Sequence, residues 1–194
     1  MVWELYQQYG DETIIEDFYP AMTAWMDAME KAGFPGTPWE FGLGDWLAPE
    51  ETDNHLIWNA FHFRNCVYMA RFAEIMNAAE DRENYLRKAL DTKTFWNSRF
   101  VNAEGLTCCA DGKLCDTQAS YAIALSCGVV SDAWKKGFAD ALARKTKACG
   151  CTVQTGFFGT GPLNPALCDG GYPELALALI QQTSYPSWLY PVTQ

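Results

Sequence analysis

The sequence predicts an all-α protein in which about seven helices form antiparallel hairpins within a helical ring. Apolar residues recur at every third or fourth position through most of the 194-residue chain, which is the period of a helix that buries one face. No stretch shows a confident strand pattern, although residues 151–154 allow one short extended segment. The connections between the helical stretches also alternate in length, which is typical of a ring of hairpins.

Three long helices are predicted in the first half of the chain. They cover residues 11–31, 52–79 and 81–100, and the second is the most apolar of the three. The third has an acidic residue in its first turn, where a carboxylate interacts favourably with the helix dipole. Residues 2–6 already show an amphipathic helical pattern directly after Met1.

Shorter helices follow in the second half. Asp116 is the expected N-cap of a helix that continues to Cys127. Ser131 or Asp132 caps a further helix that ends near Gly150. Two more short helices are expected over residues 165–168 and 173–182.

The loops at residues 33–51, 101–115, 151–164 and 183–194 are long, and those between them are tight. In a closed ring of hairpins every second connection emerges at the same end, so all the long loops should share one rim. Long loops in a compact domain usually carry function.

This rim is rich in aromatic residues with carboxylates among them. Aromatic faces stack on the C–H faces of sugars, and carboxylates accept hydrogen bonds from sugar hydroxyls, so the rim favours a carbohydrate ligand. The candidate ligand contacts are Trp39, Asp45, Trp46, Phe157 and Trp188.

Charge and composition exclude several classes of partner. The net charge is −10, so a nucleic-acid or anionic-membrane partner is not expected. No apolar run reaches the roughly 20 residues of a membrane span. Because the chain starts with a helical pattern instead of a secretory signal, a cytoplasmic location is expected.

The eight cysteines are expected to be reduced and mostly buried. A zinc site built from the cysteines between 108 and 151 would lack the usual C-x₂-C pairs. His55 and His62 are interpreted as helix-wall residues, so neither a metal nor a cofactor is expected.

Several short motifs, taken in order, resemble the bacterial α-L-rhamnosidases of the six-hairpin glycosidase class. The motifs are WELY at 3–6, YGD at 9–11, GDWL at 44–47, DTQ at 116–118, YA at 121–122, TGFFGT at 155–160 and QTSYPSW at 182–188. Each is short, but together they cover almost the whole chain.

The resemblance implies a helical toroid that hydrolyses terminal α-L-rhamnosides with inversion. In the family the catalytic acid lies in an Asp-Cys-Pro-Gln-Arg-Asp-Glu type of segment and the base in a Thr-Ile-Trp-Glu type of segment. Neither segment occurs here. Residues 1–194 are therefore expected to form one incomplete toroid domain, lacking its N- and C-terminal parts, with no catalytic residue and no activity on its own.

The resemblance also assigns Trp46 to a sugar subsite, where it would pack on the apolar edge of the deoxy-sugar. The alternative is that Trp46 seals the core, and Phe157 and Trp188 are either rim aromatics or plugs between hairpins. Asp45 is expected to accept a hydrogen bond from a sugar hydroxyl, with loop capping as its alternative. Four further acids are interpreted as helix-start carboxylates rather than catalytic ones: Glu50, Glu51, Asp53 and Asp116.

Three other functions stay open at this point. Another six-hairpin enzyme, such as a glucosidase or an unsaturated-uronide hydrolase, would share the fold. A helical-repeat interaction module would also be all-α, but it should show a fixed repeat period and mostly short loops. A catalytically silent sugar-binding protein is the third alternative.

Overall fold

The computed structural model describes residues 2–36 and 42–193, and its regular structure is helical. Two isolated antiparallel bridges, Val101–Thr107 and Cys108–Leu114, are the β-structure within these residues. The α-helices are α1 (Val2–Tyr9), α2 (Thr13–Lys31), α3 (Asn54–Ile75), α4 (Ala79–Phe100), α5 (Gln118–Cys127), α6 (Asp132–Ala148), α7 (Phe157–Asp169) and α8 (Pro173–Gln181), followed by a 3₁₀ turn at Tyr190–Val192.

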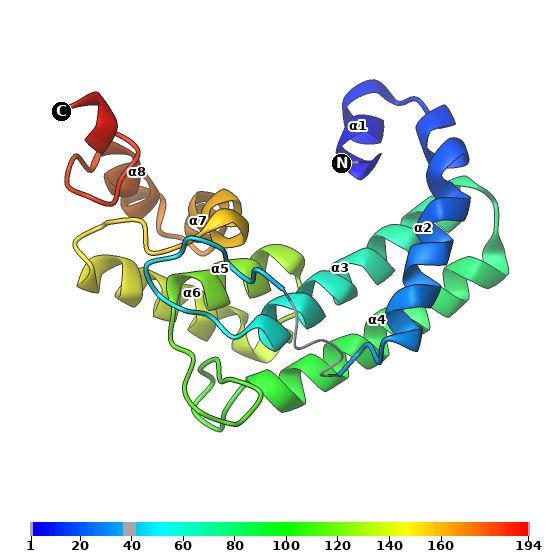
Figure 1. Ribbon diagram of the computed structural model, residues 1–194, viewed down its shortest axis with the longest axis horizontal. Helices are drawn as coiled ribbons and strands as arrows, with labels where there is room; N and C mark the ends of the chain where they lie inside the picture. Colours follow the sequence, from blue (N-terminus) through cyan, green and yellow to red (C-terminus); the bar gives the residue numbers. More distant parts are fainter. Residues whose placement is uncertain (1, 37–41, 194) are drawn as a thin grey trace.

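Consecutive helices pair as antiparallel hairpins. Helix α3 packs on α4, α5 on α6, and α7 on α8, while α3 contacts α5 and α5 contacts α7. The odd-numbered helices therefore form an inner row and the even-numbered helices flank it. The hairpins follow one another along an open arc, with the two chain ends at its two tips (Figure 1). This arrangement confirms the predicted all-α hairpin architecture.

Burial explains which helices are inner. Eight residues of α5 are buried, and α3 buries side chains on most of its circumference. Helix α4 instead buries one stripe, which includes Trp96 and Phe100. The Trp96 side chain is fully buried, and its Nε1–H donates to the carbonyl oxygen of Leu56 at 3.0 Å, which fixes α4 against α3.

The long connections meet at one end of the hairpins, as the alternation of loop lengths predicts. The N–H of Phe157 donates to the carbonyl oxygen of Trp46 at 3.0 Å, and that of Val153 donates to the carbonyl oxygen of Pro186 at 2.9 Å. The N–H of Ala110 donates to the Asp53 carboxylate at 2.7 Å. These bonds tie the four long connections together into the rim.

Two sequence predictions of local structure were wrong. Helix α7 begins at Phe157 and not at residue 165, because its first turn is capped from a distant loop and its helix accommodates Pro162 and Pro165. The N-cap of α5 is Thr117 and not Asp116; Thr117 and Ser120 form a reciprocal capping box. The amphipathic pattern after Met1 forms helix α1, as the sequence indicates, and the described residues hold eight α-helices, in line with the predicted number of about seven.

None of the helices in the described ranges is long and apolar enough to cross a membrane.

Candidate functional site

The rim is organised by a crossing between the 42–53 loop and the start of α7. The Asp45 side chain accepts hydrogen bonds from the backbone N–H groups of Gly156 (2.7 Å), Phe158 (2.8 Å) and Gly159 (2.8 Å). Asp45 is only 7% exposed. A carboxylate at a helix N-terminus satisfies otherwise unpaired donors and interacts favourably with the helix dipole. These are the contacts that the loop-capping alternative predicts for Asp45.

Two glycines allow the 42–53 loop and the start of α7 to approach this closely. A Cβ atom on Gly156 would lie 2.2 Å from the carbonyl oxygens of both Asp45 and Trp46. A Cβ atom on Gly159 would lie 2.9 Å from Oδ2 of Asp45. Sequence analysis treated these glycines only as part of a motif, and their spacing in TGFFGT was the signal that a second backbone approaches here.

Trp46 and Phe157 form the exposed part of the crossing. Their ring centroids are 5.3 Å apart and their planes differ by 14°, so the two rings are stacked. Trp46 is 48% exposed and Phe157 is 67% exposed. A shallow hollow of about 400 Å³ lies beside them, lined also by Leu47, Thr155 and Thr160. We call the stacked pair Trp46–Phe157 the aromatic platform.

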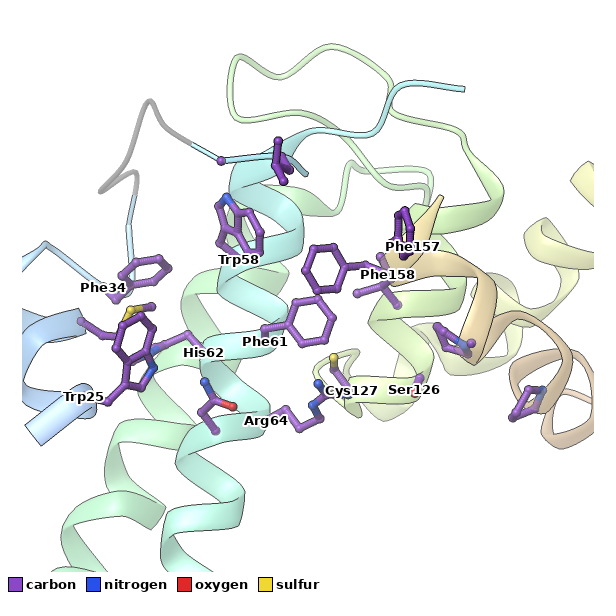
Figure 2. A pocket seen from close by; sticks show the side chains of 18 residues that line it. Trp25, Phe34, Trp58, Phe61, His62, Arg64, Ser126, Cys127, Phe157 and Phe158 are labelled. Atoms are coloured by element: carbon purple, nitrogen blue, oxygen red, sulfur yellow. The ribbon is translucent and has the colours of Figure 1, made fainter. Parts of the chain in front are cut away.

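A larger pocket of about 800 Å³ lies on the inner row, and Phe157 lies between the hollow and this pocket. Figure 2 shows Phe157 and Phe158 on one side of it, and Trp25 and Phe34 on the other. Helix α3 crosses between them and contributes Trp58, Phe61, His62 and Arg64. The walls are mainly apolar and include six Phe or Trp side chains, which is the usual composition of a ligand pocket.

The polar groups of this pocket come mainly from α3. The Nε1 of Trp58 and the Nε of Arg64 are buried and have no hydrogen-bond partner among the described residues. His62 is 1% exposed, and burial lowers its pKa to about 4. Its ring packs on Phe34 at 5.2 Å between centroids, so His62 is a neutral wall residue at pH 7, as the sequence analysis interpreted it.

Two further aromatic residues, Trp188 and Trp39, were candidate ligand contacts. Trp188 is 38% exposed and lies in the C-terminal segment, which is joined to the rim through Val153 and Pro186 and through Gln182, whose Nε2 donates to the Gly150 carbonyl at 2.6 Å. Within the described residues, no ring pair or side-chain hydrogen bond joins Trp188 to the aromatic platform. Trp39 lies outside the described residues.

The other acids considered in the sequence analysis are mostly engaged within the fold. The Nζ of Lys145 donates to Glu50 at 2.9 Å, and Asp53 caps α3 by accepting from His55 and Leu56. Burial alone would raise the pKa of Asp116, but hydrogen bonds from Arg144 and Tyr121 hold it below its ordinary value. Glu51 is exposed.

Gln118 is the last residue of the DTQ motif and the first residue of α5. It is fully buried, donates from Nε2 to the Thr152 carbonyl at 3.1 Å, and accepts at Oε1 from the Gln154 N–H at 2.8 Å. Gln118 therefore holds the loop that leads into α7. Elsewhere in the described chain, no three His, Cys, Asp or Glu side chains are grouped as a metal site.

Comparison with known proteins places the chain in a family. The family model described as the bacterial α-L-rhamnosidase six-hairpin glycosidase domain matches residues 1–194. An α-L-rhamnosidase of Streptomyces avermitilis is 33% identical over 192 residues, which cover 98% of this chain and 18% of that protein. An α-L-rhamnosidase of Formosa agariphila is 29% identical over 205 residues, covering 99% of this chain and 21% of that protein. The chain thus spans about a fifth of the length of these relatives.

Solved structures agree on the fold. The crystal structure of the Streptomyces avermitilis α-L-rhamnosidase complexed with L-rhamnose matches 99% of this chain and 18% of its own, with a TM-score of 0.86 and 33% identity. The α-L-rhamnosidase from Dictyoglumus thermophilum matches with a TM-score of 0.90 at 21% identity, over 99% of this chain and 22% of its own, and it supports the fold alone. The chain therefore belongs to the bacterial α-L-rhamnosidase six-hairpin glycosidase family.

Proposed function

We propose that the protein containing this chain hydrolyses terminal α-L-rhamnosides with inversion, and that the chain supplies part of the sugar-binding rim. The observation that carries the proposal is the exposed aromatic platform, Trp46–Phe157, on a fold shared with a relative whose structure holds L-rhamnose. The relative is 33% identical to this chain.

The chemistry of the platform suits a 6-deoxy sugar. Rhamnose carries a methyl group where most hexoses carry a hydroxymethyl group, so one edge of its ring is apolar. An exposed indole beside this edge removes apolar surface from water without needing a hydrogen bond. The hollow beside the platform is lined also by Thr155 and Thr160, whose hydroxyl groups are hydrogen-bonded to each other at 2.8 Å.

Inverting hydrolysis needs a carboxylic acid over the leaving oxygen and a carboxylate that activates water about 6.5–9.5 Å away. We assign neither role to Asp45, Glu50, Asp53 or Asp116. Each of these carboxylates accepts hydrogen bonds from the backbone or from basic side chains of the fold, which leaves it poorly placed to exchange a proton with a substrate. The acid and base are therefore proposed to come from other parts of the whole protein.

The test uses the protein at its full natural length with 4-nitrophenyl α-L-rhamnoside. We expect turnover with β-L-rhamnose as the first product, detected by ¹H NMR before mutarotation, and none with the matching glucoside or with an unsaturated uronide. Retention, or preference for one of the other two substrates, would contradict the assignment. Turnover by residues 1–194 alone that disappears in Asp45→Asn would also contradict it and would make Asp45 catalytic.

A further inference from the structure

The geometry points to Asp45 as a positioning residue that acts on the sugar through Trp46 and not by touching it. This inference rests on the proposed function, because it explains how the aromatic platform is held ready for the sugar.

The backbone donors at the start of α7 are all satisfied by the 42–53 loop. A helix begins with four N–H groups that have no partner within the helix. At α7 these belong to Gly156, Phe157, Phe158 and Gly159. The Asp45 carboxylate accepts from three of them, and the carbonyl oxygen of Trp46 accepts from Phe157 at 3.0 Å. The two consecutive residues 45 and 46 therefore satisfy the whole N-terminus of the helix, although they lie more than 100 positions away in the sequence.

These backbone bonds fix the relative position of the Trp46 and Phe157 rings. The backbone of Trp46 is fixed to the N–H of Phe157, and Asp45 fixes the residues on both sides of Phe157. The stacking distance of 5.3 Å between the two rings follows from this backbone register. Loss of the carboxylate would release the 45–46 segment from α7 and let the two rings move independently.

The Asp45 carboxylate is poorly placed to touch the sugar itself. A carboxylate offers about four lone-pair positions. Three are directed at α7, and because Asp45 is only 7% exposed, little of the carboxylate is open to a sugar hydroxyl. Trp46, by contrast, is half exposed and meets the hollow.

The chain offers a matched control in Asp53. Its carboxylate also accepts three backbone N–H bonds, from His55 (2.6 Å), Leu56 (3.3 Å) and Ala110 (2.7 Å), and it also caps a helix that starts at the rim. These bonds do not reach the aromatic platform. Asp53→Asn therefore weakens a three-bond cap in the same way, by replacing one acceptor oxygen with an amide donor, without releasing Trp46.

The first measurement is backbone hydrogen exchange by mass spectrometry on the ligand-free protein at full natural length. In Asp45→Asn the amides of residues 156–159 should exchange about tenfold faster or more, while Asp53→Asn should affect residues 55, 56 and 110 only. Asp45→Asn keeps one acceptor oxygen and Asp45→Ala keeps none, so exchange at 156–159 should rise in the order wild type, Asp45→Asn, Asp45→Ala, and Asp45→Asn alone serves if Asp45→Ala does not fold. Unchanged exchange at 156–159 in both variants would refute the anchoring role.

The second measurement is a double-mutant cycle on the dissociation constant of L-rhamnose. Asp45→Asn should weaken binding about tenfold when Trp46 is present and less than about twofold in a Trp46→Ala background. Asp53→Asn should leave the constant within about twofold of wild type. Equal losses with and without Trp46 would show that Asp45 contacts the sugar and would overturn the inference. If the unaltered protein does not bind rhamnose, the proposed function fails, and the exchange experiment alone decides the anchoring role.

Discussion

Replacing Gly156 by alanine should destabilise the protein strongly, although the substitution adds a single methyl group. Gly156 is the N-cap of α7, and its φ of −98° is accessible to any residue, so backbone strain is not the cause. The cause is the crossing, because the new Cβ would lie 2.2 Å from the carbonyl oxygens of Asp45 and Trp46.

The magnitude follows from the atoms that would have to move. A carbon and a carbonyl oxygen approach comfortably to about 3.3 Å, so the 45–46 segment must withdraw by about 1 Å. Both oxygens belong to backbone, and no side chain can rotate away. Overpacking of this kind costs about 1–3 kcal/mol, and weakening of the Asp45 cap adds about 1 kcal/mol. We expect the free energy of unfolding to fall by about 2–4 kcal/mol.

Urea unfolding of Gly156→Ala and Gly161→Ala provides the assay. Gly161 is exposed in the same helix, and a Cβ there would meet nothing within 4 Å. Gly161→Ala should therefore raise stability by about 0.5–1 kcal/mol, the ordinary gain from alanine in a helix interior. Equal stability of Gly156→Ala and wild type, or a larger loss in Gly161→Ala, would refute the close crossing.

Three further outcomes are expected. Trp46→Ala should weaken L-rhamnose binding by about 1–3 kcal/mol in calorimetric titration and change the melting temperature little; unchanged affinity with a large fall in melting temperature would instead identify Trp46 as a core plug. Because burial holds the pKa of His62 at about 4 when folded, against about 6.5 when unfolded, His62 should cost about 3 kcal/mol of stability as the pH falls from 6.5 to 4. Unfolding measured across this range should show a flatter pH dependence in His62→Gln, and identical slopes would contradict the shift. Arg144→Ala should raise the pKa of Asp116 in an NMR titration and lower stability by less than about 1 kcal/mol, because Arg144 is largely exposed; an unmoved pKa would show that Arg144 is not its main partner.

Helices that depend on their own apolar pattern could be predicted from the sequence. The stretch 11–31 was expected where α2 covers Thr13–Lys31, and 81–100 where α4 covers Ala79–Phe100. In both, one face is buried and the other is polar, so the period is visible in the sequence itself. The alternation of loop lengths was equally local information, and it located the rim at one end of the hairpins.

Features that depend on distant or competing partners could not be predicted. Asp116 and Thr117 are adjacent, and both are good N-cap residues. Asp116 is taken by Arg144, 28 residues away, and by Tyr121, which leaves Thr117 to cap α5. Residues 151–164 were expected to form a loop, but α7 begins at Phe157 and its first donors are satisfied by a loop 111 residues earlier. The residue pattern within one segment does not reveal a hydrogen-bond partner that is distant in the sequence.

The same limit explains the sequence interpretation of GDWL. An acid beside a tryptophan in a loop predicts two ligand contacts when the segment is considered alone. In the structure GDWL contacts TGFFGT, and the residues of the two motifs fall into a buried group and an exposed group. The contact between the two segments is formed by Asp45, Gly156 and Gly159, whereas the side chains of Trp46 and Phe157 are exposed. Because Asp45 accepts hydrogen bonds from the residues that follow Phe157, a change at either motif should alter both stability and sugar affinity. Trp46 and Phe157 should act mainly on affinity, Gly156 and Gly159 mainly on stability, and Asp45 on both.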